Sequence, residues 1–78
     1  MKVLIARVNE SLFDGEAYSL RAPGLAGELT VLADHMPLVT PLKPGTVYLR
    51  EEKDAKEQEF SVQGGVLEVH SEGVTVLL

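Results

Sequence analysis

Hydrophobic and polar positions alternate along this chain in short runs that are separated by turn residues. The run from 46 to 50 places Val47 and Leu49 on one side of an extended segment, with polar or larger residues between them. Alternation with a period of two is typical of a half-buried strand, and no window shows the 3.6 period of a helix. The pattern therefore predicts an all-β fold, a two-sheet β-sandwich of about ten short strands with no helical domain.

The same pattern predicts an aliphatic core, because the chain has no Trp and an aromatic content of 5%. Phe13-Asp14-Gly15 is expected to form a turn behind a buried Phe13. The segment 51–59 is nearly all charged and lies between two alternating runs, so we expect a solvated hairpin tip rather than an acidic docking patch. The residues expected to face the core are Val47, Leu49, Phe60, Val62, Leu67, Val69 and Val76.

A central stretch carries all four prolines and is bounded by two Pro-Gly turns. It should form a strand over 28–32, a tight ordered loop over 33–37 and a second extended run over 38–42. Pro37 and Pro41 lack the N–H that a sheet ladder requires, so the second run should lie at a sheet edge or be broken by bulges. The structural turn residues expected along the chain are Gly24, Gly27, Pro44, Gly45, Gly64 and Gly65.

Length and charge narrow the class of protein. Seventy-eight residues predict one domain over 1–78. A net charge of −5 argues against nucleic-acid binding and against direct binding to anionic lipid, because both need clustered Lys and Arg. The absence of Cys excludes disulfides and thiolate metal sites. No apolar run approaches the ~18 residues of a membrane span, and the N-terminal run is too short for a signal peptide.

Catalytic and metal-binding patterns are missing. Asp34 and His35 are neighbours that point apart on an extended chain, and Glu68 with His70 would supply only two ligands. No G-x-S-x-G elbow or phosphate-binding loop is present, and nothing singles out two of the acidic residues as an acid/base pair. We therefore expect no active site, metal, cofactor or small-molecule ligand. His35 is either structural, donating its ring N–H to a backbone carbonyl, or part of an interface, and the two roles are compatible.

One known family contains these motifs in the same order. They are Phe13-Asp14-Gly15, Pro23-Gly24 followed by Gly27-Glu28, Val31-Leu32, His35, Pro37-Leu38, Thr40, Leu42-Lys43-Pro44-Gly45, Phe60, Val62, Gly64-Gly65, Leu67-Glu68-Val69 and Val74-Thr75-Val76-Leu77. Over its whole length, the chain resembles the N-terminal β-sandwich domain of the epsilon subunit of F-type ATP synthases.

The resemblance implies a non-catalytic subunit of the rotating central stalk, which links the gamma subunit to the membrane c ring and couples proton or sodium flow to ATP synthesis. It implies a position at the cytoplasmic face of the bacterial inner membrane. Glu28, with Leu29 beside it, would contact the c ring, whereas His35 and Thr40 would lie near gamma. The chain departs from the family at Ala33-Asp34, where Pro-Gly is commoner, so we expect the backbone of this loop to differ from that of the family.

A C-terminal helical hairpin, which usually follows this domain in the family, is not in the sequence. We therefore expect this chain neither to block rotation nor to bind ATP, since the resemblance assigns both roles to the hairpin. The alternative function is a free-standing β-sandwich module that binds a protein or a sugar. Such modules usually expose aromatic platforms, and this chain has only two Phe and two Tyr. An oligonucleotide-binding barrel conflicts with the charge and the scarce aromatics.

Overall fold

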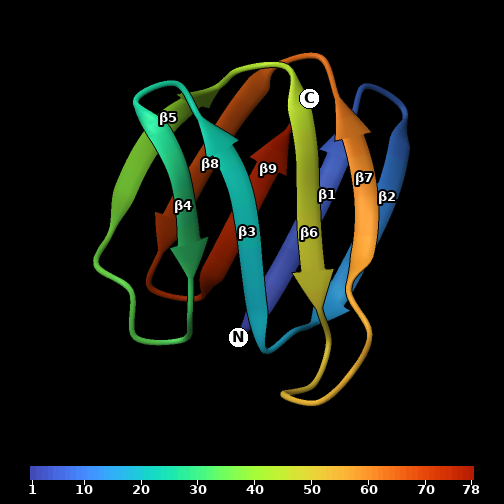
Figure 1. Cartoon of the computed structure of the whole chain (residues 1–78), viewed down its shortest axis with the longest axis vertical. Helices are drawn as coiled ribbons and strands as arrows, with labels where there is room; N and C mark the ends of the chain where they lie inside the picture. The colour runs from blue at the N-terminus through green and yellow to red at the C-terminus, as the bar shows by residue number, and fades with distance from the viewer.

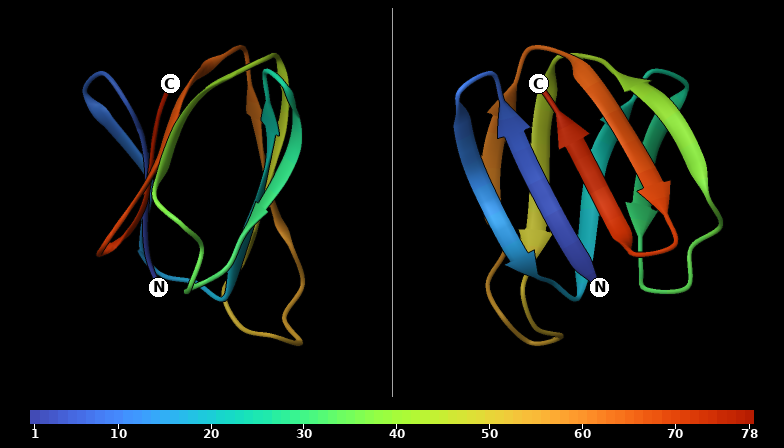
Figure 2. Two further views of the ribbon diagram at one scale, coloured as in Figure 1. Left: turned by 90° about the vertical axis from the view of Figure 1, so that its left-hand side faces the viewer. Right: turned by 180° about the vertical axis from the view of Figure 1, so that it is seen from behind.

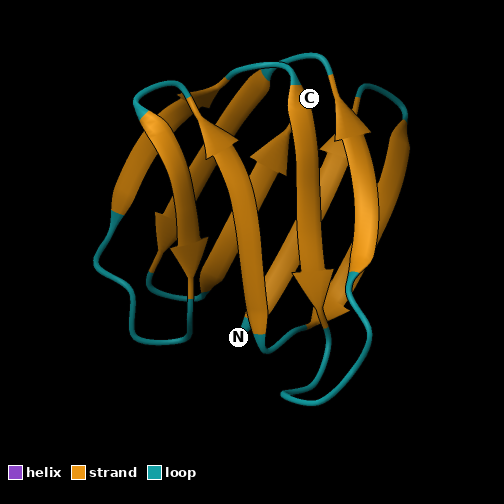
Figure 3. Cartoon of the chain, viewed as in Figure 1, coloured by secondary structure: helices purple, strands orange, loops and turns teal.

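Nine short strands and no helix make up the computed structural model, which describes residues 1–78 (Figure 1, Figure 3). The all-β prediction is confirmed, with nine strands where about ten were expected. No helix is present that is long and apolar enough to cross a membrane. The strands are β1 (Lys2–Arg7), β2 (Glu10–Glu16), β3 (Ser19–Gly24), β4 (Gly27–Val31), β5 (Leu38–Leu42), β6 (Gly45–Arg50), β7 (Gln58–Val62), β8 (Gly65–His70) and β9 (Gly73–Leu77).

The strands form two layers that face each other (Figure 2). We call β4-β3-β6-β7 the front layer and β2-β1-β9-β8-β5 the back layer, in the order in which neighbours pair. A single pairing between Gly24 of β3 and Leu42 of β5 joins the layers, so the sandwich is one nine-stranded sheet that curls back over itself. The pair β1–β9 is parallel, and the other pairs are antiparallel.

Alternation along each strand fills the space between the layers with aliphatic side chains. The core contains 14 buried residues, all of them apolar, and no polar side chain is buried. Six of the expected core residues are buried, namely Val47, Leu49, Val62, Leu67, Val69 and Val76. Phe60 is only partly buried and packs against the core from its rim, because it lies on β7, the edge strand of the front layer. The strand faces were therefore assigned correctly from the sequence.

The turn expected at Phe13-Asp14-Gly15 is wrong. These residues lie within β2, where Phe13 pairs with Ile5 and packs against the core. The chain reverses earlier, where Asn9 has a φ of 66°. Asparagine tolerates this left-handed conformation because its short side chain can bond locally. The chain therefore turns at an Asn, and burial of Phe13 keeps the Asp-Gly pair extended.

The extended run that follows Pro37 forms β5 at an edge of the back layer, as expected. β5 pairs with β8 along its whole length but meets β3 only at Leu42. The backbone of Pro41 faces the β3–β4 turn rather than β8, so its missing N–H costs no hydrogen bond of the β5–β8 ladder. Its carbonyl accepts a bond from the N–H of Leu25, at 2.9 Å, which ties β5 to the β3–β4 turn.

Candidate partner-binding surfaces

The predicted turn residues gather at one end of the sandwich, which we call the turn end. The β3–β4, β5–β6 and β7–β8 connections meet there, at the top of Figure 1. These connections contain or border all six predicted turn residues, namely Gly24, Gly27, Pro44, Gly45, Gly64 and Gly65. The β4–β5 and β6–β7 connections lie at the opposite end, which we call the loop end.

Close packing explains two of these glycines. A Cβ on Gly24 would lie 2.7 Å from the carbonyl oxygen of Gly27, so the tight β3–β4 turn leaves no room for a side chain. Gly65 has a φ of +124°, and a Cβ there would overlap the carbonyl oxygen of Leu77 on β9. Gly24 is therefore required because a side chain would not fit. Gly65 is required for the same reason and for its backbone conformation.

Glu28 lies near the turn end, on the outer surface of the front layer. It is the second residue of β4, and its side chain is 56% exposed. An Nη1–H of Arg21 donates to Glu28 Oε2 over 3.3 Å. The other predicted ring residue, Leu29, points the opposite way because neighbours on a strand alternate. Leu29 is half-buried and packs against the core, so the structure presents Glu28 to a partner and places Leu29 behind it.

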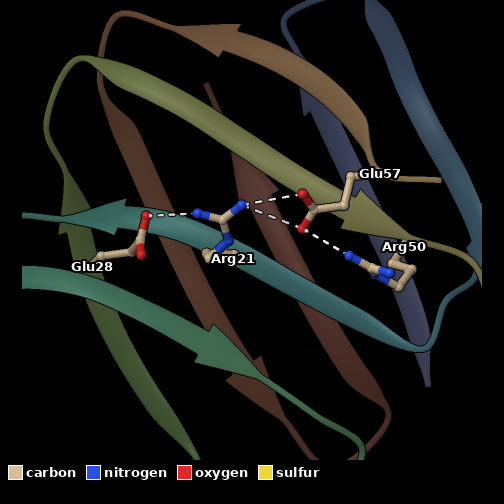
Figure 4. A network of polar contacts seen from close by, with 4 residues as sticks. All are labelled: Arg21, Glu28, Arg50 and Glu57. Atoms are coloured by element: carbon tan, nitrogen blue, oxygen red, sulfur yellow. Dashed lines mark hydrogen bonds and ion pairs between the residues drawn. The ribbon is translucent and has the colours of Figure 1, made fainter. Parts of the chain in front are cut away.

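Arg21 stands at the centre of a network of polar contacts on the outer surface of the front layer (Figure 4). Its Nη2 donates to both carboxylate oxygens of Glu57, at 3.2 and 3.3 Å. Its guanidinium also stacks on the ring of Tyr48, 4.0 Å from the centroid. Arg50 joins the network through an ion pair of 3.6 Å with Glu57. We call these four side chains, together with Glu28, the polar network.

The electrostatic balance at Arg21 keeps it charged. Burial of the guanidinium lowers the pKa of Arg21, but the hydrogen bond and negative charge of Glu57 raise it. Glu28 and Tyr48 raise it further, so the pKa lies above its ordinary value. Because an arginine with a raised pKa stays protonated at physiological pH, Arg21 keeps its positive charge within the network.

Residues 33–37, which we call the histidine loop, lie at the loop end. His35 and Glu28 are therefore at opposite ends of β4. The backbone N–H of His35 donates to the carbonyl oxygen of Leu32 at 3.0 Å, which closes a tight turn. The Nδ1 of His35 lies 2.7 Å from the carbonyl oxygen of Met36. A carbonyl only accepts, so Nδ1 carries the proton. His35 thus makes the backbone contact expected of a structural histidine, on a loop whose Met36 is exposed.

Thr40 does not lie on an outer surface. It pairs with the buried Leu67, and so it points toward the other layer from the middle of β5. Its hydroxyl donates to the carbonyl oxygen of Pro41 at 3.1 Å. The residues on either side, Val39 and Pro41, point outward instead. A contact with a partner at this strand would therefore be made mainly by Val39 and Pro41.

The outer surface of the back layer carries a continuous row of apolar residues. Pro41 of β5 pairs with Val66, Val66 with Leu77 of β9, and Leu77 with Ala6 of β1. Val39 lies beside this row. The exposed fractions are 66% for Val39, 43% for Val66 and 56% for Leu77. We call these five residues the apolar row, and exposed apolar patches of proteins are candidate interaction sites.

Sequence reasoning selected Glu28 but missed the rest of the polar network and the apolar row. Arg21 and Glu57 are 36 positions apart and meet only because β3 pairs with β6, whose hairpin carries Glu57. The tip expected to be solvated is exposed over 51–54, but Glu57 is only 29% exposed and is engaged by Arg21 and Arg50. A signal for the apolar row was present, because Val66 and Leu77 occupy outward positions of alternating runs. Nothing in the sequence aligned them with Pro41 and Ala6.

Two layers with unlike outer surfaces, one polar and one apolar, define a small β-sandwich interaction domain. Residues 1–78 match the family described as the ATP synthase delta/epsilon chain, beta-sandwich domain, and the chain belongs to this family. The family resemblance seen in the sequence is therefore confirmed, as is the expectation of a non-catalytic ATP synthase epsilon-type domain.

Curated relatives agree with this assignment. The chain is 42% identical over 77 residues to an ATP synthase epsilon chain of Herminiimonas arsenicoxydans, a match covering 99% of this chain and 55% of the relative. It is 40% identical over 77 residues to one of Janthinobacterium sp. (strain Marseille), again covering 99% of this chain and 55% of the relative. The chain therefore spans about half the length of these relatives.

Solved structures show the same fold. A chain of the Euglena gracilis mitochondrial ATP synthase, OSCP/F1/c-ring in rotational state 1, superposes with a TM-score of 0.86 at 25% identity, covering 96% of this chain and 48% of that one. A chain of the Tetrahymena thermophila mitochondrial ATP synthase central stalk and c-ring superposes with a TM-score of 0.75 at 21% identity, covering 100% of this chain and 63% of that one. The second likeness concerns the fold alone.

Proposed function

We propose that residues 1–78 form one epsilon-type domain of the rotor of a proton- or sodium-translocating ATP synthase. The domain links the gamma subunit to the c ring and so couples ion flow to ATP synthesis, at the cytoplasmic face of the bacterial inner membrane. Membership of the family supports the assignment to an ATP synthase, and the bacterial relatives support the proposed location at the inner membrane. The observation that carries the proposal is the apolar row, because a rotor coupling needs a surface that stays attached to a partner.

Gamma is the partner that we assign to the apolar row. Burying a Val or Leu side chain completely contributes about 1.5–3 kcal/mol, so three exposed members offer a partner a substantial association energy. The histidine loop runs directly into β5, whose Val39 and Pro41 belong to the row. His35 therefore borders this surface, and Thr40 supports it from behind. The surface that we assign to gamma is thus bordered by His35 and supported from within by Thr40.

The c ring is the partner that we assign to the turn end. Glu28 is exposed there, at the far end of β4 from the histidine loop, so the two partners contact separate parts of the domain. Tight turns at Gly24 and Gly65 make this end rigid, which suits a contact that must transmit force. A carboxylate on such an end accepts charge-assisted hydrogen bonds from polar ring loops.

Binding to the two partners separately tests the proposal. Glu28→Arg should weaken binding to a purified c ring while leaving binding to gamma unchanged, and the domain should stay folded. Glu59→Arg is the matched control, since Glu59 is exposed on β7 of the same layer but lies away from the turn end. Failure to co-purify with gamma would instead favour a free-standing binding module. Normal ring binding and pumping with Glu28→Arg would refute the contact at Glu28.

A further inference from the structure

Glu28 does not stand alone on the outer surface of the front layer. We propose that Arg21 is a positioning residue for Glu28: it orients the carboxylate toward the ring and is itself fixed from the opposite side by Glu57 and Tyr48. This inference rests on the proposed contact between Glu28 and the c ring. It adds to that contact a residue on another strand and an anchor on the β6–β7 hairpin.

Arg21 is held far more firmly on the side of Glu57 than on the side of Glu28. Toward the hairpin it makes two hydrogen bonds to Glu57 and stacks on Tyr48. Toward the turn end it makes one bond, to Glu28. Glu57 is also the less exposed carboxylate, at 29% against 56% for Glu28. The hairpin side is therefore the anchor, and Glu28 is the side chain that Arg21 places.

The strand register explains how one arginine reaches both carboxylates. Arg21 pairs with Thr30 on β4 and with Tyr48 on β6, so it sits between the strand that carries Glu28 and the hairpin that carries Glu57. The planar guanidinium presents donors on both of its terminal nitrogens, and here Nη1 serves Glu28 while Nη2 serves Glu57. A lysine has one ammonium group and cannot reproduce this fork.

Positioning has an energetic consequence for binding. A free surface glutamate must give up rotamer freedom when it contacts a partner, and this loss weakens binding. Arg21 restricts Glu28 before the ring arrives, so that part of this cost is removed from binding. Only one of the two oxygens of Glu28 bonds to Arg21, which leaves Oε1 for a donor from the ring.

A double-mutant cycle with the purified c ring tests the inference. Glu28→Gln should weaken binding about tenfold, as expected for loss of a charged hydrogen bond. Arg21→Gln should weaken it about two- to tenfold when Glu28 is present, and should have no effect in the Glu28→Gln background. Additive effects of the two substitutions, or tighter binding after Arg21→Gln, would overturn the positioning role.

Two further variants separate geometry from charge and from stability. Arg21→Lys keeps the charge but loses the fork, so it should bind the ring as weakly as Arg21→Gln; restored affinity would overturn the inference. Arg50→Gln is the matched control, because Arg50 also pairs with Glu57 but does not touch Glu28. It should bind the ring like the original chain, and an effect equal to that of Arg21→Gln would point to overall charge instead.

A measurement without the ring distinguishes this inference from the proposed function. The Nε–H signal of Arg21 in NMR relaxation experiments should report a rigid side chain, should stay rigid in Glu28→Gln, and should become mobile in Glu57→Gln. The opposite result, with mobility appearing in Glu28→Gln, would overturn the anchoring by Glu57. If Glu28→Gln leaves ring binding unchanged while this pattern holds, the ring contact at Glu28 fails, and the positioning role for ring binding fails with it.

Discussion

The outer surfaces of the two layers are built from the same alternating strands but have opposite chemistry. In the front layer, the central outward side chains bond to one another through Arg21, so their charges are already matched within the domain. In the back layer, outward positions of four neighbouring strands form the apolar row, whose Val39, Val66 and Leu77 are exposed. A surface whose polar groups already bond to one another gains little from a partner except at the free oxygen of Glu28, whereas an apolar row gains by leaving water.

This comparison requires that the folding energy comes from the shared core rather than from either outer surface. Leu49 is fully buried on β6, so Leu49→Ala should lower the free energy of unfolding by about 2–5 kcal/mol. Thr46→Ala on the outer surface of the same strand should change it by less than about 0.5 kcal/mol. Denaturant unfolding measures both, and similar losses for the two variants would show that the front surface is part of the stabilising core.

Partner binding should depend on the back surface. Leu77→Asp places a charge in the middle of the apolar row and should weaken binding to gamma by about a hundredfold or more, because a charge buried without a partner is costly. Ser61→Asp makes a comparable change on the outer surface of β7 and should leave gamma binding intact. Calorimetric titration with gamma compares them. Equal losses in both variants would contradict the assignment of gamma to the apolar row.

Arg21 should contribute no pH dependence to stability between neutral and mildly alkaline pH. The raised pKa of Arg21 means that its contribution to stability is complete below the unfolded-state pKa and is lost only as pH rises through the still higher folded-state value. Both values lie far above neutrality, so the difference in unfolding free energy between Arg21→Gln and the original chain should stay constant from about pH 7 to pH 9. A difference that shrinks over this range would show that another group titrates within the network.

The smallest effect is expected at the tip of the β6–β7 hairpin. Replacing Lys53-Asp54-Ala55 with Asn-Gly should change stability by less than about 0.5 kcal/mol and leave gamma and ring binding unchanged, since residues 51–54 are exposed. The replacement keeps Glu57, which anchors Arg21. Thermal unfolding and the two binding assays measure the outcome. Loss of assembly would move a partner surface to this hairpin.

Alternation in the sequence predicted the fold well because burial of one strand face is a local property. It placed Val47, Leu49 and Val62 in the core. The missing N–H groups of Pro37 and Pro41 placed β5 at the edge of a layer. Sequence reasoning failed at Phe13, where a turn-like Asp-Gly pair is overruled by packing against the core. Local propensity yields to tertiary contacts in such cases.

The candidate surfaces were harder to predict because they depend on register between distant strands. Glu28 and His35 were selected from family motifs, yet the partner of Glu28 is Arg21, which no motif contains. Leu29 and Thr40 were selected as contacts, but both point away from the outer surfaces. The apolar row assembles from β1, β5, β8 and β9, and no stretch of sequence shows it whole.

Cross-saturation NMR of the chain bound to gamma tests the difference between the two outer surfaces most directly. Irradiation of gamma should transfer saturation to the methyl groups of Val39, Val66 and Leu77 in the apolar row. The methyl groups of Thr30 and Thr46, on the outer surface of the front layer, should keep their full intensity. Saturation of Thr30 and Thr46, with Val39, Val66 and Leu77 unaffected, would contradict the account.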